Sequence, residues 1–243
     1  MKKILTMAAV LAMFSTPAMA QMWTEVGDAP EGVPGRQDTL GVGPLTSIVG
    51  QINRGVGDHT DTYSIIVTDV QQFYATTKSF FGGTATTATG GVADTRLWLW
   101  DELGNPLIAN DDVNDASLGT TDNLRSFISD PSTFTANTGE VVAPTATGIS
   151  LVAGQKYLLS ISLFSNDPDD AGGVDIFSLG SDFDALHGPN TAAGPFAGWE
   201  NGASTTVADY TIALRGATFC AVPEPASLAL ISIGAIALLR RRR

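Results

Sequence analysis

Cysteine is almost absent from this chain, because Cys220 is the only one among its 243 residues. A single thiol cannot form a disulfide within the chain, so the packing of the core alone must hold the fold together. Cys220 could pair with another molecule or carry a lipid. It does not follow an N-terminal lipobox, however, and we interpret it as an incidental residue near a linker.

Basic residues are scarce over the body of the chain. Residues 21–222 hold seven Lys and Arg against 24 Asp and Glu, which is a net charge of −17. Such a charge repels phosphate backbones and anionic lipid headgroups, and it favours solubility or cation binding. The composition therefore predicts no nucleic-acid partner.

The patterns of common catalytic sites are also missing. The two histidines, His59 and His187, do not have metal-ligand spacing. No Gly-x-Ser-x-Gly elbow, His-Glu-x-x-His helix or phosphate-binding glycine loop occurs. Carboxylates are abundant, but a catalytic acid needs an apolar setting that a sequence does not reveal. We predict that the protein is not an enzyme, and an unrecognised hydrolase is the distant alternative.

The N-terminus has the three parts of a secretory signal peptide. Lys2 and Lys3 form a positive region, residues 4–14 are apolar, and residues 18–20 (Ala-Met-Ala) form a small-residue cleavage site. We predict export through the Sec pathway with cleavage after Ala20. A buried N-terminal helix is the alternative.

The chain ends in VPEPASLALISIGAIALLRRRR. Residues 226–239 carry no charge, and a helix of that length would span roughly 21 Å at about 1.5 Å per residue. A hydrocarbon core is about 30 Å thick, so we predict a marginal membrane helix suited to temporary retention. The arginines after the apolar span predict a cytoplasmic C-terminus.

This tail resembles the PEP-CTERM sorting signal of Gram-negative bacteria. The resemblance rests on a Pro-Glu-Pro motif, one apolar helix and a basic end, in that order. The matching sorting residues are Pro223, Glu224, Pro225, Arg240, Arg241, Arg242 and Arg243. The resemblance implies an exosortase-type sorting protease as partner, transient contact with the bacterial membrane, and delivery to the cell envelope, cell surface or extracellular matrix. A plain tail anchor is the alternative.

Between the two ends, apolar residues alternate with period two in short bursts separated by Gly, Asp, Asn, Thr and Pro, which is typical of strands. We expect Trp98 and Trp100 on opposite faces of their strand, and residues 72–77 as a partner of residues 61–67. The predicted fold is an all-β, antiparallel, jelly-roll-like β-sandwich, plus the cleaved signal helix and the short C-terminal membrane helix. The expected strands are residues 61–67, 72–77, 95–100, 106–109, 156–164 and 208–215.

Three motifs of the central region are similar to the bacterial pre-peptidase C-terminal (PPC) domain. They are Asp61-x-Tyr-x-Ile-x-Val67, the stretch from Asp94 to Asp112 with its Leu-Trp-Leu-Trp strand, and Ala153-Gly-Gln-Lys-Tyr-x-Leu-x-Ile161. The resemblance implies a jelly-roll sandwich that acts as a noncatalytic module. This chain departs from the family by a long insertion between Asp112 and Gly154 and by the lack of a peptidase. The expected organisation is residues 1–20 signal peptide, 21–39 lead-in, 40–219 sandwich and 220–243 sorting signal.

An acidic turn after the strand at 106–109 is the candidate metal site. Hard cations such as calcium take six to eight oxygen ligands, and this stretch offers five oxygen-bearing side chains within six positions. A second acidic cluster follows at residues 166–170. The alternative is that these residues cap strand ends and form Asx turns. The predicted calcium ligands are Asn110, Asp111, Asp112, Asn114 and Asp115.

Residues 180–202 are rich in Gly, Pro and Asn but also aromatic, and they are predicted to form an ordered binding loop in which Phe196 and Trp199 contact a ligand. Two function classes follow. The first is a noncatalytic envelope or matrix protein displayed among extracellular polysaccharide. The second is a carbohydrate- or calcium-binding module. Exposed, coplanar aromatic rings would favour the second class, and burial of those rings in a core would remove its carbohydrate form.

Overall fold

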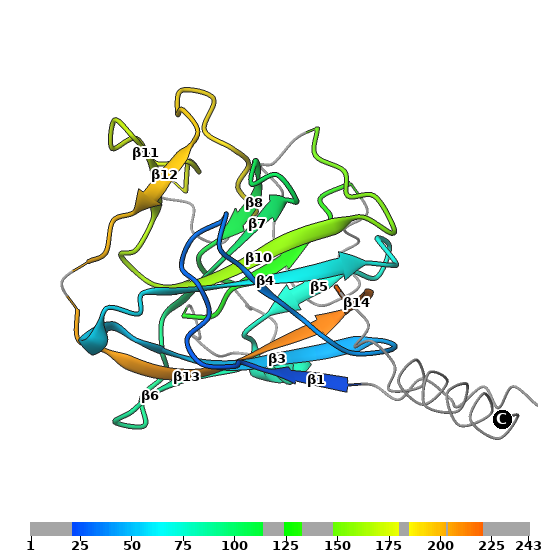
Figure 1. Cartoon of the computed structure of the whole chain (residues 1–243), viewed down its shortest axis with the longest axis horizontal. Coiled ribbons are helices and arrows are strands. Elements are labelled where there is room, and N and C mark those ends of the chain that lie inside the picture. The colour runs from blue at the N-terminus through cyan, green and yellow to red at the C-terminus, as the bar shows by residue number, and fades with distance from the viewer. Residues whose placement is uncertain (1–20, 114–123, 133–147, 180–184, 203, 221–243) are drawn as a thin grey trace, which may run out of the picture.

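The computed structural model describes residues 21–113, 124–132, 148–179, 185–202 and 204–220 (Figure 1). The predicted signal helix at residues 1–20 and the predicted tail helix lie outside these ranges. Within them, helical structure is limited to the 3-10 turns η1 (Arg54–Val56) and η2 (Ser79–Phe81), and no helix is long and apolar enough to cross a membrane.

Two six-stranded sheets make up most of the described chain (Figure 1). In the first sheet the order is β1-β3-β13-β5-β9, and β6 also pairs with β13. Its strands are β1 (Gln21–Thr24), β3 (Leu45–Asn53), β5 (Tyr74–Thr76), β6 (Thr84–Thr87), β9 (Phe127–Ser129) and β13 (Val207–Arg215).

In the second sheet the order is β14-β4-β10-β7-β8, and β2 also pairs with β4. A separate two-stranded sheet joins β11 (Pro168–Asp170) to β12 (Phe196–Trp199). The strands of the second sheet are β2 (Gln37–Asp38), β4 (Thr60–Val67), β7 (Thr95–Asp101), β8 (Pro106–Asn110), β10 (Lys156–Leu163) and β14 (Ala217–Phe219).

The all-β prediction is confirmed, but the sheets are mixed rather than purely antiparallel. The short strands β1 and β2 run parallel to β3 and β4, respectively. Both come from residues 21–39, which we expected to precede the sandwich. Parallel neighbours need a crossover of a dozen or more residues, and about twenty residues separate β1 from β3, which meets that requirement.

One predicted strand pairing is wrong. Strand β5 pairs with β13 and β9 in the first sheet, whereas we expected it beside β4. The edges of β4 are taken by β10 on one side and by β14 and β2 on the other. The hairpin of β7 and β8 agrees with the sequence prediction.

The main core lies between the two sheets and follows the expected alternation. Tyr63, Ile65 and Val67 of β4 face Tyr210 and Ile212 of β13 in one apolar cluster. Each of these side chains is at most 2% exposed. Because alternate residues of a strand share a face, the period-two pattern alone selected these inward positions.

The outer face of the second sheet carries another apolar cluster. Trp98 and Trp100 both belong to it, while Leu97 and Leu99 face the main core. Our expectation that the two tryptophans point to opposite faces is therefore wrong, since residues two apart in a strand lie on the same side of the pleat. Their indole N–H groups donate to Ser162 Oγ and Ser160 Oγ on the neighbouring β10, at 3.0 and 3.1 Å.

The chain changes sheets at Gly216, between β13 and β14. Gly216 has φ +69°, and a Cβ there would lie 2.4 Å from the backbone oxygen of Asp69. Only glycine combines this left-handed conformation with so close a backbone approach. The residue thus places the end of the described chain on the second sheet.

Candidate functional site

The seven predicted sorting residues lie outside the described residues. The described chain ends at Cys220, directly after β14. The Cys220 N–H donates to the Thr39 carbonyl at 3.1 Å, and burial raises the pKa of its half-buried thiol, with a smaller contribution from Asp38. The predicted Pro-Glu-Pro motif therefore begins three residues after a point that is hydrogen-bonded to the sandwich.

Of the predicted calcium ligands, Asn114 and Asp115 lie outside the described residues, and Asn110 is committed to backbone groups. The Asn110 amide donates to the carbonyls of Ala185 and Asp112, at 3.0 and 2.8 Å, and its Oδ1 accepts from the Phe127 N–H at 2.7 Å. Asn110 therefore joins β8 to two neighbouring segments, which is a structural role.

Asp111 and Asp112 do meet a third carboxylate. One carboxylate oxygen from each of Asp94, Asp111 and Asp112 lies within 4.8 Å of the others. The Arg96 guanidinium lies beside this group of carboxylates. Its Nη2 donates to Asp111 at 2.8 Å, and its Nη1 donates to Asp167. A buried arginine supplies the positive charge that a metal ion would bring. Calcium binding at residues 110–115 stays a prediction.

The carboxyl group of Asp94 has a raised pKa. Burial raises its pKa to about 6, and the charge of Asp111 adds to the shift, while Arg96 and Arg54 oppose it. Asp94 lines a pocket beside the exposed ring of Phe164. The Arg54 guanidinium in the same pocket donates to the carbonyls of Leu163 and Phe164, at 2.6 and 2.9 Å. Arg54 thus satisfies two backbone carbonyls at the C-terminal end of β10, which is a structural role.

The two predicted ligand-binding aromatics are not an exposed platform. Trp199 is only 9% exposed and packs at 5.9 Å from Trp98 and 6.3 Å from Trp100. Phe196 is half-buried against the same cluster, and its ring is inclined by 66° to that of Trp199. Strand β12 places both rings over the outer face of the second sheet, where they cover the tryptophans of β7 and shield them from water. The pair forms a second core.

The second acidic cluster makes the contacts of turn caps. Asp170 accepts hydrogen bonds from the N–H groups of Gly172, Val174 and Gly194. Asn166 likewise joins two segments, donating to Thr60 Oγ1 and accepting from the Asn201 N–H. These contacts match the Asx-turn alternative.

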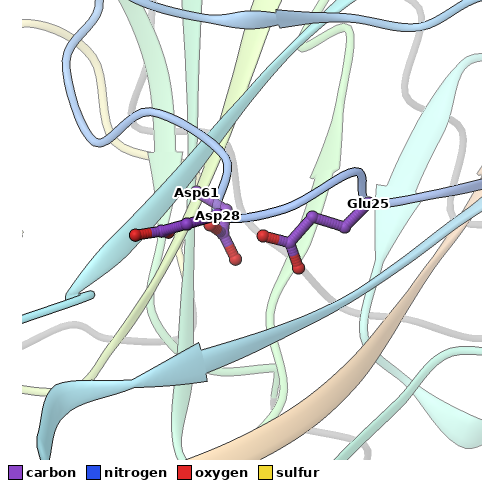
Figure 2. A group of neighbouring side chains, drawn as sticks. All are labelled: Glu25, Asp28 and Asp61. Atoms are coloured by element: carbon purple, nitrogen blue, oxygen red, sulfur yellow. The ribbon is translucent and has the colours of Figure 1, made fainter. Parts of the chain in front are cut away.

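A further group of three carboxylates was not anticipated from the sequence (Figure 2). One carboxylate oxygen each of Glu25, Asp28 and Asp61 lies within 4.8 Å of the others. Glu25 and Asp28 follow β1, and Asp61 lies near the start of β4 in the opposite sheet. The only signal in the sequence was an acidic residue at the start of a strand, because 33 positions separate Asp28 from Asp61.

The Asp61 carboxylate is fully buried, and only one of its two oxygens accepts a hydrogen bond. Its Oδ2 accepts from the Tyr210 hydroxyl at 2.6 Å, and that hydroxyl lies 2.6 Å from the hydroxyl of Tyr63. Its Oδ1 is buried without a hydrogen-bond partner. Burial, followed by the charge of Glu25, raises the pKa of Asp61 well above its usual value, although the Tyr210 hydrogen bond lowers it.

The comparisons with known proteins identify the end of the chain. Residues 221–243 match the family model of the PEP-CTERM protein-sorting motif. The match covers about a tenth of the chain, and it implies an exported, cell-surface protein sorted by an exosortase. No curated protein and no solved structure matches the chain significantly. The PPC-like resemblance of the sandwich stays a prediction.

Proposed function

We propose that this chain is a noncatalytic protein of the cell envelope or extracellular matrix, in which a PPC-like, jelly-roll sandwich is delivered by an exosortase-processed tail. The observation that carries the proposal is the sorting motif at residues 221–243. A signal that directs a protein to the surface serves a protein whose work is done there. In this proposal the N-terminal segment enters the Sec pathway of a Gram-negative bacterium.

The polar groups of the sandwich support a noncatalytic role. Arg96 and Arg54 are held by carboxylates or backbone carbonyls, and Asp170 and Asn166 cap loops. The two histidines lie on separate segments, His59 just before β4 and His187 beside β8. Arg96, Arg54, Asp170 and Asn166 thus already have a structural use, which favours display over turnover.

The net charge of −17 over residues 21–222 suits a protein that stays soluble and monodisperse among polysaccharide chains. The carbohydrate-binding alternative loses its main argument, because Trp199 is buried instead of exposed. The cation-binding alternative gains support from the group of carboxylates at Glu25, Asp28 and Asp61.

Cell fractionation tests the sorting step. Glu224→Ala, or deletion of residues 240–243, is expected to leave the protein unprocessed or in the wrong compartment. The matched control is Glu102→Ala, which removes an exposed acid from a turn of the sandwich and breaks only a surface pair with Lys156. An antibody against the sandwich reports size and location. Unchanged size and location in both tail variants would overturn the proposal.

A further inference from the structure

The carboxylates of Glu25, Asp28 and Asp61 lack any counter-charge among the described residues. No described Lys, Arg or His forms an ion pair with any of the three. The group at Asp111 differs in this respect, because Arg96 neutralises it. Three carboxylates held together, one of them fully buried, cannot all carry a charge without destabilising the fold unless something positive joins them.

The backbone is shaped to bring these groups together. Glu25 is anchored by two N–H groups, since its Oε1 accepts from Ala29 at 2.8 Å and its Oε2 from Gln51 at 2.9 Å. A Cβ on Gly50 would lie 2.6 Å from Glu25 Oε2 and 2.3 Å from the Tyr210 hydroxyl. Glycine at position 50 therefore leaves the space in which the Glu25 carboxylate and the tyrosine attached to Asp61 approach each other.

The buried Oδ1 of Asp61 is a second, independent observation that points to a ligand. Asp61 is 0% exposed, and this oxygen accepts no hydrogen bond. A buried carboxylate oxygen without a partner costs more than the hydrogen bond would contribute. Figure 2 shows the Glu25 side chain directed from the N-terminal segment toward Asp61.

We propose that Glu25, Asp28 and Asp61 bind one calcium ion, which joins the N-terminal segment to β4 of the opposite sheet. Calcium–oxygen distances of about 2.3–2.6 Å place opposite ligands about 5 Å apart, which accommodates oxygens within 4.8 Å of one another. Asp28 is exposed, so water completes the six to eight ligands from its side. Magnesium fits less well because it demands a stricter octahedron and dehydrates reluctantly.

The site binds its calcium ion only after export and then holds the N-terminal segment against the sandwich. Binding sites of extracellular modules have calcium dissociation constants of roughly 10⁻⁴–10⁻³ M, so they fill outside the cell and stay empty in the cytoplasm. The ion ties residues 25–28, close to the predicted signal cleavage site, to the sandwich. This inference is independent of how the C-terminal tail is processed, so its failure would leave the sorting proposal intact.

Thermal melting of the full-length chain in calcium and in chelator tests the site. At free calcium about one hundred times Kd, the Tm is expected to rise by about 5–10 °C relative to chelator, and magnesium is expected to do less. Asp61→Asn keeps an acceptor for Tyr210 but removes the buried charge. This variant is expected to lose the calcium shift and to melt in chelator at or above the wild-type Tm.

Two further variants keep the test decisive if Asp61→Asn does not fold. Asp28→Asn changes an exposed side chain and is expected to reduce the calcium shift. Asp175→Asn is the matched control, because it removes an exposed charge from the group of Asp169, Asp175 and Glu200, in which Asp169 is half-buried, and it is expected to keep the full shift.

Terbium luminescence supplies a readout separate from stability. Tyr63 and Tyr210 lie next to Asp61, so excitation of tyrosine is expected to sensitise bound terbium, and calcium is expected to quench the emission by displacement. Equal wild-type melting in calcium and chelator would overturn the proposal and leave a proton as the occupant of Asp61. A calcium shift undiminished in both Asp61→Asn and Asp28→Asn, or lost equally in Asp175→Asn, would also overturn it.

Discussion

The Arg96 guanidinium donates to Asp111 Oδ2 at 2.8 Å, and the two side chains are only 5% and 2% exposed. The pair links β7 to the residue that follows β8, inside the turn that the sequence marked as a calcium site. Removal of one partner from a buried pair leaves an uncompensated charge, and this costs far more than the loss of a surface pair.

We therefore predict that Asp111→Ala lowers the free energy of unfolding by about 3–5 kcal/mol in urea titrations. The comparison is Glu102→Ala, which breaks the exposed pair with Lys156 and should cost at most about 1 kcal/mol. Similar small losses in the two variants would mean that Asp111 is not structurally committed to Arg96. The loss at Asp111 is expected in calcium and in chelator alike.

The tryptophans of β7 give a second prediction. Trp98→Ala and Trp100→Ala should each cost about 3–5 kcal/mol, because the two side chains are 1% and 0% exposed. Both rings contact Phe177 and Trp199, so the cost of the double variant should differ from the sum of the single costs by about 0.5–3 kcal/mol.

The control for this coupling is Trp100→Ala combined with Ile52→Val, a change in the main core between the sheets. These two costs should add, since the residues belong to separate clusters. A small loss for either tryptophan alone would contradict the burial of the outer face of β7.

Asp94 gives a pH prediction. Its pKa is raised to about 6 in the folded protein, while an unfolded Asp titrates near 3.8. Between these two pH values the folded state keeps the Asp94 proton and the unfolded state has lost it. Proton binding at Asp94 therefore contributes fully to the free energy of unfolding below the unfolded pKa. This contribution to the free energy of unfolding, up to about 3 kcal/mol, is lost as the pH rises from about 4 to about 6.

Urea titrations of wild type and Asp94→Asn across pH 4–7, in chelator, measure this contribution. The wild-type free energy of unfolding should fall with rising pH more steeply than that of the variant. Parallel pH profiles would show that Asp94 titrates as an ordinary surface carboxylate.

Local patterns in the sequence predicted several of the strands and the sorting motif at residues 221–243. Period-two alternation identified β4, β7, β10 and β13 because burial of one face is a local property of a strand. The same pleat rule, applied correctly, places Trp98 and Trp100 on one face. The sorting motif was readable because its three parts are consecutive residues that need no folding partner.

Only the tertiary structure decided which residues meet across the sandwich. Strand β5 joins β13 because sheet neighbours are chosen by long-range packing, and Trp199 is buried because β12 happens to cover β7. Acidic density in the sequence pointed to residues 110–115, where Arg96 already provides the charge. The carboxylates of Glu25 and Asp28, which have no counter-charge in the described part of the chain, lie more than thirty positions before Asp61 and meet it only when the two sheets pack.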